Sequence, residues 1–272
     1  MTVIQAVLLG VLQGITEFLP VSSSGHLVLA QELLNIPHEG DMFFEVFVHF
    51  GTLLSVLVAF RKEVWAILLA LGALLKRPRD FMLLYNTNEY LRLGVFIVIG
   101  SIPSALIGLN YEHQIENLFA DPKLIAVMLM VTGFIIFLTR FVDPTERAPV
   151  GLISSIIIGC AQAVAIIPGI SRSGSTISTA LFSGVSRENS AKFSFLLAVP
   201  VIFGATLLET KALISSPPSV HKLLTLGVGT AVAAISGYFA IMILLDILRK
   251  RRFSWFSYYC FVVGILGVLF IG

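Results

Sequence analysis

Six long apolar stretches constrain this chain more than any other feature of its sequence. A helix that crosses a bilayer needs about 20 mostly apolar residues, and each stretch reaches or approaches that length. They cover residues 43–60, 91–109, 124–138, 193–208, 223–245 and 256–271. Only 12% of the 272 residues are charged, which is about half the share found in a soluble domain. The sequence therefore predicts an all-α integral membrane protein with six full spans.

Two further apolar regions are interrupted before they reach the length of a span. Residues 3–19 and 151–167 each run into a Ser- and Gly-rich break that contains proline. Each break is followed by a second apolar run of about ten residues, which is too short to cross a bilayer. Such a helix–break–helix pattern is typical of a segment that enters and leaves the membrane on one side. We therefore predict two re-entrant helical hairpins, at about 3–35 and 151–184.

The two hairpin sequences resemble each other. QGITEFLPVSSSGHLVLA aligns with QAVAIIPGISRSGSTISTA, so that Gln13 corresponds to Gln162 and Gly25 to Gly174. This indicates two repeats within one membrane domain, each a hairpin followed by three spans. The domain is 1–272, and the repeats are 1–143 and 149–272. Because each repeat crosses the membrane an odd number of times, the second is inverted relative to the first. Inverted repeats with broken helices place a site near the bilayer midplane, where we expect the hairpin tips to meet.

The basic residues predict the orientation. With both termini outside the cell, most of the 18 Lys and Arg residues fall in cytoplasmic segments, as the positive-inside rule requires. The first hairpin then enters from the outside and the second from the cytoplasm. Segment 76–90 is expected to lie at the cytoplasmic interface. The basic residues are spread along a chain with a net charge of +2, so no nucleic-acid partner is expected.

Polar side chains gather in the two breaks, although such groups are costly inside a membrane unless they serve a site. The first break supplies a carboxylate, hydroxyls and an imidazole, and the second supplies a guanidinium and hydroxyls. They are Glu17, Ser22, Ser23, Ser24, His26, Ser171, Arg172, Ser173, Ser175 and Thr176. Arg172 has no acidic neighbour in its own segment, and its planar fork binds phosphate through two hydrogen bonds. With the N-termini of two short helices beside it, Arg172 predicts a pocket for phosphate or diphosphate.

The first break also offers nucleophiles and a place for a cation. A serine activated by His26, or His26 itself, is a candidate nucleophile. Glu17 lies one helical turn from Gln13, and a carboxylate beside a diphosphate is where Mg²⁺ or Ca²⁺ is held. Glu45, in the first predicted span, is assigned to substrate binding. The alternative for Glu45 is a satisfied polar pair with His49, one turn further on.

Alternative interpretations of the breaks stay open. Arg172 also fits a structural ion pair with Glu17 across the interface of the repeats. Ser22 and Ser173 also fit helix N-caps. Inverted repeats with broken helices are the architecture of transporters, so a lipid flippase is the alternative to an enzyme. The cluster of Ser, His and Glu in the first break favours the enzyme, since transport of an anion does not require it.

At these two motifs the sequence resembles the undecaprenyl-diphosphate phosphatase family, also called the bacitracin-resistance family. QGITEFLPVSSSGHL and PGISRSGSTIS are similar to its two signature motifs, and FFEVFVHFGT and FSFLLAVP to further segments, so the resemblance covers essentially the whole chain. It implies a membrane phosphatase that converts undecaprenyl diphosphate into undecaprenyl phosphate and inorganic phosphate. Such an enzyme recycles the lipid carrier of cell-wall synthesis and confers bacitracin resistance. At the matched positions, the implied catalytic residues are Glu17, Ser23, His26 and Arg172.

The resemblance also implies ligands and a location. Substrate contacts are expected from the other motif positions, Ser22, Ser24, Gly25, Ser171, Ser173, Gly174 and Thr176. A divalent cation, Mg²⁺ or Ca²⁺, is expected at Glu17, with Gln13 standing where some family members have Glu. The pocket is expected to open to the outer face of a bacterial plasma membrane, and bacitracin to compete for the substrate rather than bind the protein. The nucleophile, Ser23 or His26, and the oligomeric state, monomer or homodimer, stay open.

Overall fold

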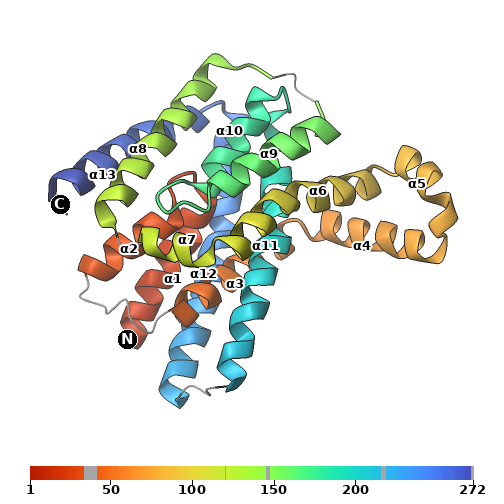
Figure 1. Cartoon of the computed structure of the whole chain (residues 1–272). Helices are drawn as coiled ribbons and strands as arrows, with labels where there is room; N and C mark the ends of the chain where they lie inside the picture. Colours follow the sequence, from red (N-terminus) through yellow and green to blue (C-terminus); the bar gives the residue numbers. More distant parts are fainter. Residues whose placement is uncertain (34–41, 120, 145–147, 216–218, 271–272) are drawn as a thin grey trace.

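The protein is built from helices, as the apolar pattern predicts. The computed structural model describes residues 1–33, 42–119, 121–144, 148–215 and 219–270, and no strand occurs among them. Figure 1 shows the arrangement of the helices. Their bounds are α1 Val3–Phe18, α2 Ser23–Leu33, α3 Met42–Ala59, α4 Arg61–Lys76, α5 Phe81–Thr87, α6 Glu89–Asn110, α7 Glu112–Phe119, α8 Pro122–Leu138, α9 Leu152–Val164, α10 Arg172–Phe182, α11 Arg187–Ser215, α12 Val220–Arg249 and α13 Phe256–Phe270.

Five helical segments within the described residues are long and apolar enough to cross a membrane. They are Glu89–Asn110, Pro122–Phe141, Arg187–Leu207, Val220–Arg249 and Phe253–Phe270. Each coincides with one of the six predicted spans. The remaining prediction, 43–60, falls on α3, whose apolar part Phe44–Ala59 is a shorter helix. The length and composition of these helices indicate a multi-pass membrane protein.

Both predicted helix breaks are present, and local backbone preferences explain them. A residue before proline avoids the helical conformation, and Leu19, which precedes Pro20, is extended with φ −64° and ψ 142°. Ser22 then adopts a positive φ of 66°, and α2 begins at the next residue. In the second break Gly169 has a φ of 88°. A Cβ on Gly169 would lie 2.3 Å from the carbonyl oxygen of Ile125, so only glycine fits there.

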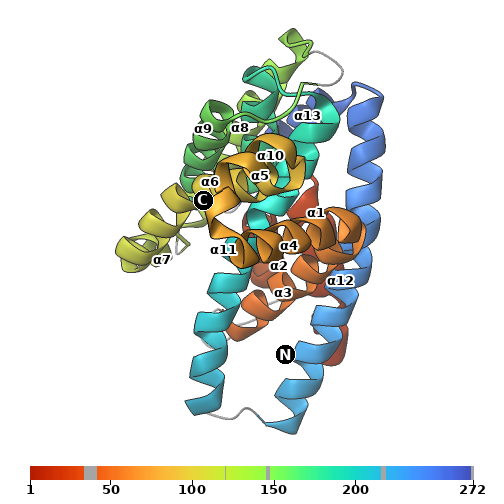
Figure 2. The ribbon, with the colours of Figure 1, turned by 90° about the vertical axis from the view of Figure 1, so that its right-hand side faces the viewer.

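The helices of the two halves of the chain pack in matching pairs. α1 lies along α12, and α9 lies along α6. α3 packs against both α11 and α12, and Figure 2 shows it between their lower parts. α8 and α13 lie side by side (Figure 1). The end of α1 is fixed by Phe18, which is fully buried and meets the ring of Phe195 on α11 edge to face at 5.3 Å. The first break is therefore anchored in the core.

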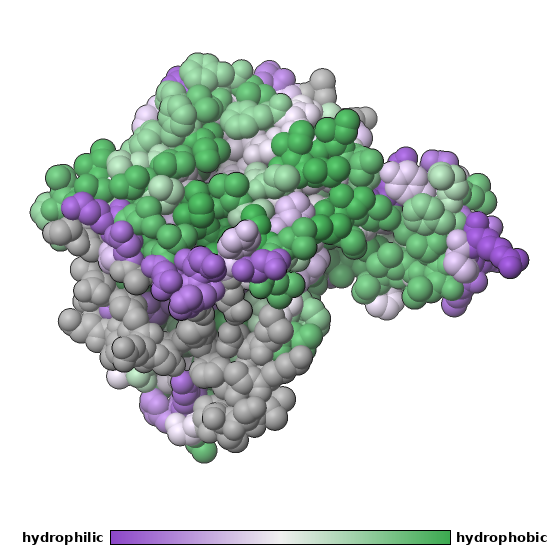
Figure 3. Space-filling view, in the orientation of Figure 1, coloured by the Kyte–Doolittle hydropathy of each residue, from purple (hydrophilic) through white to green (hydrophobic). Residues whose placement is uncertain are grey.

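One part of the molecule projects from the body as an arm, formed by α4, α5 and the start of α6 (Figure 1). α4 lies against α6 and exposes Trp65, Leu68 and Leu69. Figure 3 shows an apolar surface along the arm and a hydrophilic tip, where Lys76 and Arg77 are exposed. The sequence predicted an interfacial segment only at 76–90, so the helical part of the arm before Lys76 is a finding of the structure.

Replacing Gly159 by alanine is expected to destabilise the protein by about 1–3 kcal/mol. A Cβ at Gly159 would lie 2.3 Å from the carbonyl oxygen of Gly100, so α6 and α9 would have to move apart. The midpoint of thermal unfolding in detergent measures the effect. Gly108→Ala on α6 is the matched control, because nothing lies within 4 Å of its added Cβ. Equal midpoints for the two variants would contradict the close packing of α6 on α9.

Candidate active site

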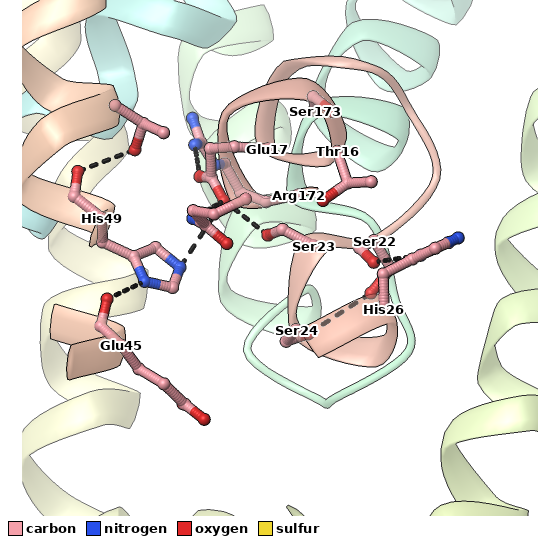
Figure 4. Close-up of polar contacts among 12 residues, drawn as sticks. Thr16, Glu17, Ser22, Ser23, Ser24, His26, Glu45, His49, Arg172 and Ser173 are labelled. Carbon is pink, nitrogen blue, oxygen red and sulfur yellow. Dashed lines mark hydrogen bonds and ion pairs between the residues drawn. The ribbon is translucent and has the colours of Figure 1, made fainter. Parts of the chain in front are cut away.

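Glu17 is the centre of the polar cluster, and its partners come from α1, α2, α3 and α10 (Figure 4). Its Oε1 pairs with Nη2 of Arg172. Its Oε2 accepts hydrogen bonds from Ser23 Oγ at 2.5 Å and from Gln13 Nε2 at 3.0 Å. His49 Nε2 lies 3.5 Å from the same oxygen. The carboxylate is 7% exposed, so this buried charge is held by one cation and several polar groups, as burial requires.

The two breaks place Ser23 and Arg172 at the beginnings of short helices. Ser23 is the first residue of α2 and Arg172 the first of α10. Ser171 is the N-cap of α10, because its Oγ accepts the N–H of Gly174 at 3.0 Å. The N-cap is therefore Ser171 rather than Ser173. The Oγ of Ser22 accepts the N–H of Gly25 at 3.4 Å, in the same arrangement at the start of α2.

Ser173 and Thr176 fix the first turn of α10 to its neighbours, Ser173 to the first break and Thr176 to α11. Ser173 Oγ donates to the carbonyl oxygen of Leu19 at 3.2 Å and so joins α10 to the first break. Thr176 Oγ1 donates to the carbonyl oxygen of Arg172 at 2.7 Å and lies 2.6 Å from Ser194 Oγ on α11. Both side chains are fully or almost fully buried. In this structure they support the backbone that carries Arg172.

The cluster forms one wall of a pocket of about 200 Å³. Its polar lining includes Glu17, Ser23, His49 and Arg172, and its apolar lining comes mainly from α11 and the second break. The lining residues are Glu17, Ser22, Ser23, Ser24, His49, Ser104, Phe119, Gln162, Ala165, Ile166, Ile170, Ser171, Arg172, Ala198, Val201 and Ile202. Nη1 of Arg172 is buried and has no hydrogen-bond partner among the described residues. The pocket thus joins a carboxylate, a serine hydroxyl and an unused guanidinium donor, which is a set of groups suited to phosphate chemistry.

Comparison of the sequence with known protein families gives a match over almost the whole chain. The model of the family described as "Bacitracin resistance protein BacA" covers residues 6–266. The chain belongs to this family. It is 42% identical to an undecaprenyl-diphosphatase of Salinibacter ruber over 269 residues, which are 98% of this chain and 99% of the relative. It is also 42% identical to one of Halothermothrix orenii over 274 residues, covering 100% and 99%. The undecaprenyl-diphosphatase of Korarchaeum cryptofilum is 41% identical over 268 residues, covering 97% and 98%. The resemblance noted at the two motifs is confirmed.

In this member of the bacitracin resistance family, His26 lies apart from Ser23 and Glu17. Its Nδ1 donates to the carbonyl oxygen of Ser22 at 2.8 Å, which leaves Nε2 to accept from the Tyr259 hydroxyl, also at 2.8 Å. The two rings stack with centroids 5.6 Å apart. With both ring nitrogens engaged, His26 is not placed to take the proton of Ser23 in this state. The expected pairing of His26 as base with Ser23 as nucleophile is absent from this structure.

Position 45 is also placed differently from expectation, and position 49 takes its place. The carboxylate of Glu45 accepts from Gln31 Nε2 at 3.3 Å and points away from Glu17 in Figure 4. His49 Nδ1 donates to the carbonyl oxygen of Glu45 at 2.7 Å, and its Nε2 faces Glu17. His49 was therefore missed as a site residue. The one signal for it was its position one helical turn after Glu45, on the same face of α3.

Of the remaining motif residues, two serines line the pocket and two glycines lie outside its lining. Ser22 and Ser24 line it and lie 3.3 Å apart through their Oγ atoms. Gly25 and Gly174 lie where a side chain would crowd its neighbours. A Cβ on Gly25 would be 3.2 Å from Ile125, and one on Gly174 would be 3.0 Å from Ser171. Gly25 therefore lets the first turn of α2 pack closely on Ile125 of α8. Gly174 lets the first turn of α10 close on its N-cap, Ser171.

The donor atoms next to Glu17 fit a cation that is shared with a substrate. Gln13 Oε1 is buried without a partner among the described residues, and its amide lies beside the Glu17 carboxylate. No group of three or more His, Cys, Asp or Glu side chains gathers in the part of the chain that the structure describes. Mg²⁺ is often held by one or two carboxylates together with substrate phosphates. One carboxylate and one amide oxygen fit that mode of binding rather than a complete protein cage.

Replacing His26 by alanine is expected to lower kcat/KM by about 10- to 100-fold, which is the cost of misplacing catalytic groups. Tyr259→Phe is expected to give a loss in the same direction, because it removes the hydroxyl that holds His26. Both losses should be smaller than that of Ser23→Ala. Phosphate release from a prenyl diphosphate in detergent measures all three variants. A loss in His26→Ala as large as in Ser23→Ala, with Tyr259→Phe unchanged, would show that His26 acts on the substrate directly.

Proposed function

We propose that this chain is a membrane phosphatase that hydrolyses undecaprenyl diphosphate to undecaprenyl phosphate and inorganic phosphate, and thereby confers bacitracin resistance. Family membership supports the substrate, since the relatives over the whole chain are named undecaprenyl-diphosphatases. The observation that carries the chemistry is the meeting of Glu17, Ser23 and Arg172 in one buried pocket. In such a pocket Ser23 is a nucleophile, Glu17 accepts its proton, and Arg172 binds the phosphate.

Arg172 binds the terminal phosphate in the proposed mechanism. Its Nη1 has no hydrogen-bond partner among the residues that the structure describes, so a phosphate oxygen takes that donor first. The second donor, Nη2, then exchanges Glu17 for a second phosphate oxygen, which gives the bidentate contact that guanidinium and phosphate favour. The guanidinium stabilises the negative charge on the transferred phosphoryl group.

Ser23 is the nucleophile in this proposal, and Glu17 is its base. The Ser23 hydroxyl already donates to Glu17 Oε2 at 2.5 Å, so its proton moves to that carboxylate as Oγ attacks the terminal phosphorus. The bond from phosphorus to the bridging oxygen breaks, and the lipid monophosphate leaves. Water then attacks the phosphoserine, the phosphorus–Oγ bond breaks, Glu17 returns its proton to Ser23 Oγ, and the inorganic phosphate keeps the protons of the water. The reaction consumes one water and releases one inorganic phosphate.

A divalent cation, Mg²⁺ or Ca²⁺, belongs to the same proposal. Glu17 and Gln13 would hold it, since one carboxylate oxygen becomes free when Arg172 turns to the phosphate and Gln13 Oε1 lacks a partner. When bound, the ion neutralises charge on the diphosphate. Ser22, Ser24 and Ser171 offer further hydroxyl contacts around the phosphates, because they line the same pocket.

The proposed topology has two inverted repeats with re-entrant hairpins, and both termini outside. Helix packing supports it, because α1 of the first half packs on α12 of the second, and its counterpart α9 of the second half packs on α6 of the first. The positive-inside distribution of Lys and Arg supports the orientation. The enzyme then works in a plasma membrane with its pocket open to the outer face. Bacitracin, in this proposal, competes for the lipid diphosphate and not for the protein.

Phosphate release tests the proposal. Purified protein in detergent is given a prenyl diphosphate with Mg²⁺, with Ca²⁺, or with a chelator, and inorganic phosphate is measured. We expect release that depends on the cation and on Glu17. A correctly folded preparation that releases no phosphate under any of these conditions would refute the proposed activity. Movement of lipid by that preparation across proteoliposomes would favour a transporter instead.

A further inference from the structure

Two polar side chains of the pocket have no function in the mechanism described above. Ser104 on α6 and Gln162 on α9 both line the pocket and are 2% and 3% exposed. The Oγ of Ser104 and both amide atoms of Gln162 have no hydrogen-bond partner among the described residues. In native proteins a buried polar group without a partner is uncommon and needs an explanation.

The close approach of α6 and α9 brings these two residues to the same pocket. Gly100 and Gly159 let the backbones of the two helices touch. Ser104 follows Gly100 by about one helical turn, and Gln162 follows Gly159 by slightly less. The packing that would be lost in Gly159→Ala is therefore also the packing that delivers Ser104 and Gln162 to the pocket.

The side-chain amide of Gln162 has different surroundings from the amide at the aligned position of the first hairpin. Gln13 occupies the aligned position in the first hairpin, and its amide donates to Glu17 at 3.0 Å. Gln162 has no carboxylate in the corresponding place, because residue 166 of the second hairpin is isoleucine. Like the hydroxyl of Ser104 and Nη1 of Arg172, its amide has no partner in the described part of the chain, and all three residues line the pocket. These groups offer donors to one shared space.

We propose that Ser104 and Gln162 form a subsite for the phosphate that is attached to the lipid. The inference rests on the proposed phosphatase function. The terminal phosphate is already served by Arg172 and Ser23, whereas the second phosphate of the same diphosphate enters the same pocket and needs donors of its own. A hydroxyl and an amide supply neutral donors, which hold this phosphate both before and after the reaction. Ser104 and Gln162 are thus binding residues that position the substrate, not catalytic groups.

The pocket lining is consistent with this direction of binding. Val201 and Ile202 on α11 and Phe119 on α7 line the same pocket and supply apolar surface to the first part of a prenyl chain. A diphosphate with its terminal group on Arg172 and its lipid-attached group on Gln162 would place the chain among apolar side chains. Inorganic phosphate lacks the lipid-attached group, so it binds through Arg172 and the other groups around the terminal phosphate, without Ser104 or Gln162.

The test separates the two phosphates by inhibition. Ser104→Ala and Gln162→Leu are compared with the wild type for hydrolysis of farnesyl diphosphate, with farnesyl monophosphate and inorganic phosphate as inhibitors. We expect KM to rise about 10- to 100-fold in each variant, because a hydrogen bond to a charged group is lost, and kcat to change by less than about threefold. Inhibition by farnesyl monophosphate should weaken in parallel with KM. Inhibition by inorganic phosphate should stay the same.

Stability measurements distinguish this function from a structural one. Within the described residues neither polar group has a hydrogen-bond partner, so the thermal midpoint of Gln162→Leu should equal or exceed that of the wild type. If the leucine variant does not fold, Gln162→Met provides a more flexible side chain of similar size. Ser178→Ala is the matched control, since Ser178 is also buried with an unpartnered hydroxyl but lies outside the pocket lining. Its KM should remain that of the wild type.

The outcomes that would overturn the subsite differ from those that would overturn the phosphatase. An active wild type whose KM is unchanged in both variants would refute the subsite alone. Weaker inhibition by inorganic phosphate, with inhibition by the monophosphate unchanged, would also refute it, because the residues would then serve the terminal phosphate. A folded wild type without phosphate release would refute the proposed function itself.

Discussion

Arg172→Ala is expected to lower kcat/KM for a prenyl diphosphate by about 10³-fold or more, the scale found when an arginine that stabilises a transferred phosphoryl group is lost. The guanidinium is the cation that faces both Glu17 and the pocket, and its Nη1 is unused in the resting protein. Arg172→Lys keeps the charge but loses the planar fork, so we expect it to restore only a small part of the activity. Steady-state phosphate release measures both variants.

A second variant is needed because Arg172→Ala also breaks a buried ion pair. Removing one partner of such a pair typically costs about 3–5 kcal/mol of stability, since the other charge stays buried alone. Adding Glu17→Gln removes that charge, so the double variant should recover the thermal midpoint while remaining inactive. Arg140→Ala is the matched control, because Arg140 is exposed and stacks on Phe137 outside the pocket. Because Glu17 is also the proposed base, the double variant tests stability alone. Folded Arg172→Ala protein with nearly full activity would limit Arg172 to a structural role.

Ser23→Ala is expected to reduce kcat by about 10⁴-fold or more, the scale of losing a nucleophile. Because the variant keeps Arg172, its affinity for a prenyl diphosphate should change little, and binding without turnover becomes measurable. In the wild type, a rapid acid quench with a labelled terminal phosphate should leave label on Ser23. Peptide mapping identifies the labelled residue.

The neighbouring Ser24 provides the control for Ser23. It lines the same pocket and contacts Ser22 instead of Glu17, so Ser24→Ala should lower kcat by less than about tenfold. Label found on His26 would contradict serine catalysis and would require His26 to leave Tyr259 during the reaction. Ser23→Ala with nearly full activity would remove Ser23 from the mechanism altogether.

Local sequence features were sufficient to predict the long apolar helices and the two breaks. Apolar runs mark these helices because lipid requires a continuous apolar surface. Proline, which has no backbone N–H, marks a break where it adjoins a Ser- and Gly-rich stretch, as at Pro20 and Pro168, whereas Pro103 and Pro200 lie inside α6 and α11. The helical part of the arm was missed, since Arg61, Lys62 and Glu63 in its first turn made its apolar run look too short for a span. This helix, α4, lies along α6, and the apolar length of a segment does not indicate such packing.

The candidate site could be predicted only as a set of residues and not as a geometry. The meeting of Glu17 with Arg172 was one of two interpretations of Arg172, and the structure shows that ion pair. The separation of His26 from Ser23 depends on Tyr259, which lies 233 residues further along the chain. No local pattern indicates such a contact. The sequence also did not indicate Ser104 as a site residue, because a single serine in an apolar helix is ordinarily a packing residue.

The ion pair between Glu17 and Arg172 also affects what happens after the chemistry. Arg172 already has an anionic partner within its own molecule, so every phosphate that binds must compete with that carboxylate. A lipid diphosphate competes with many contacts, whereas free inorganic phosphate has few. In this proposal the Glu17 carboxylate competes with phosphate groups for the guanidinium of Arg172. It displaces inorganic phosphate more readily than it displaces the lipid diphosphate. In the proposed mechanism the re-formed pair displaces inorganic phosphate after each turnover, and it leaves no uncompensated charge in the apolar interior of the empty pocket.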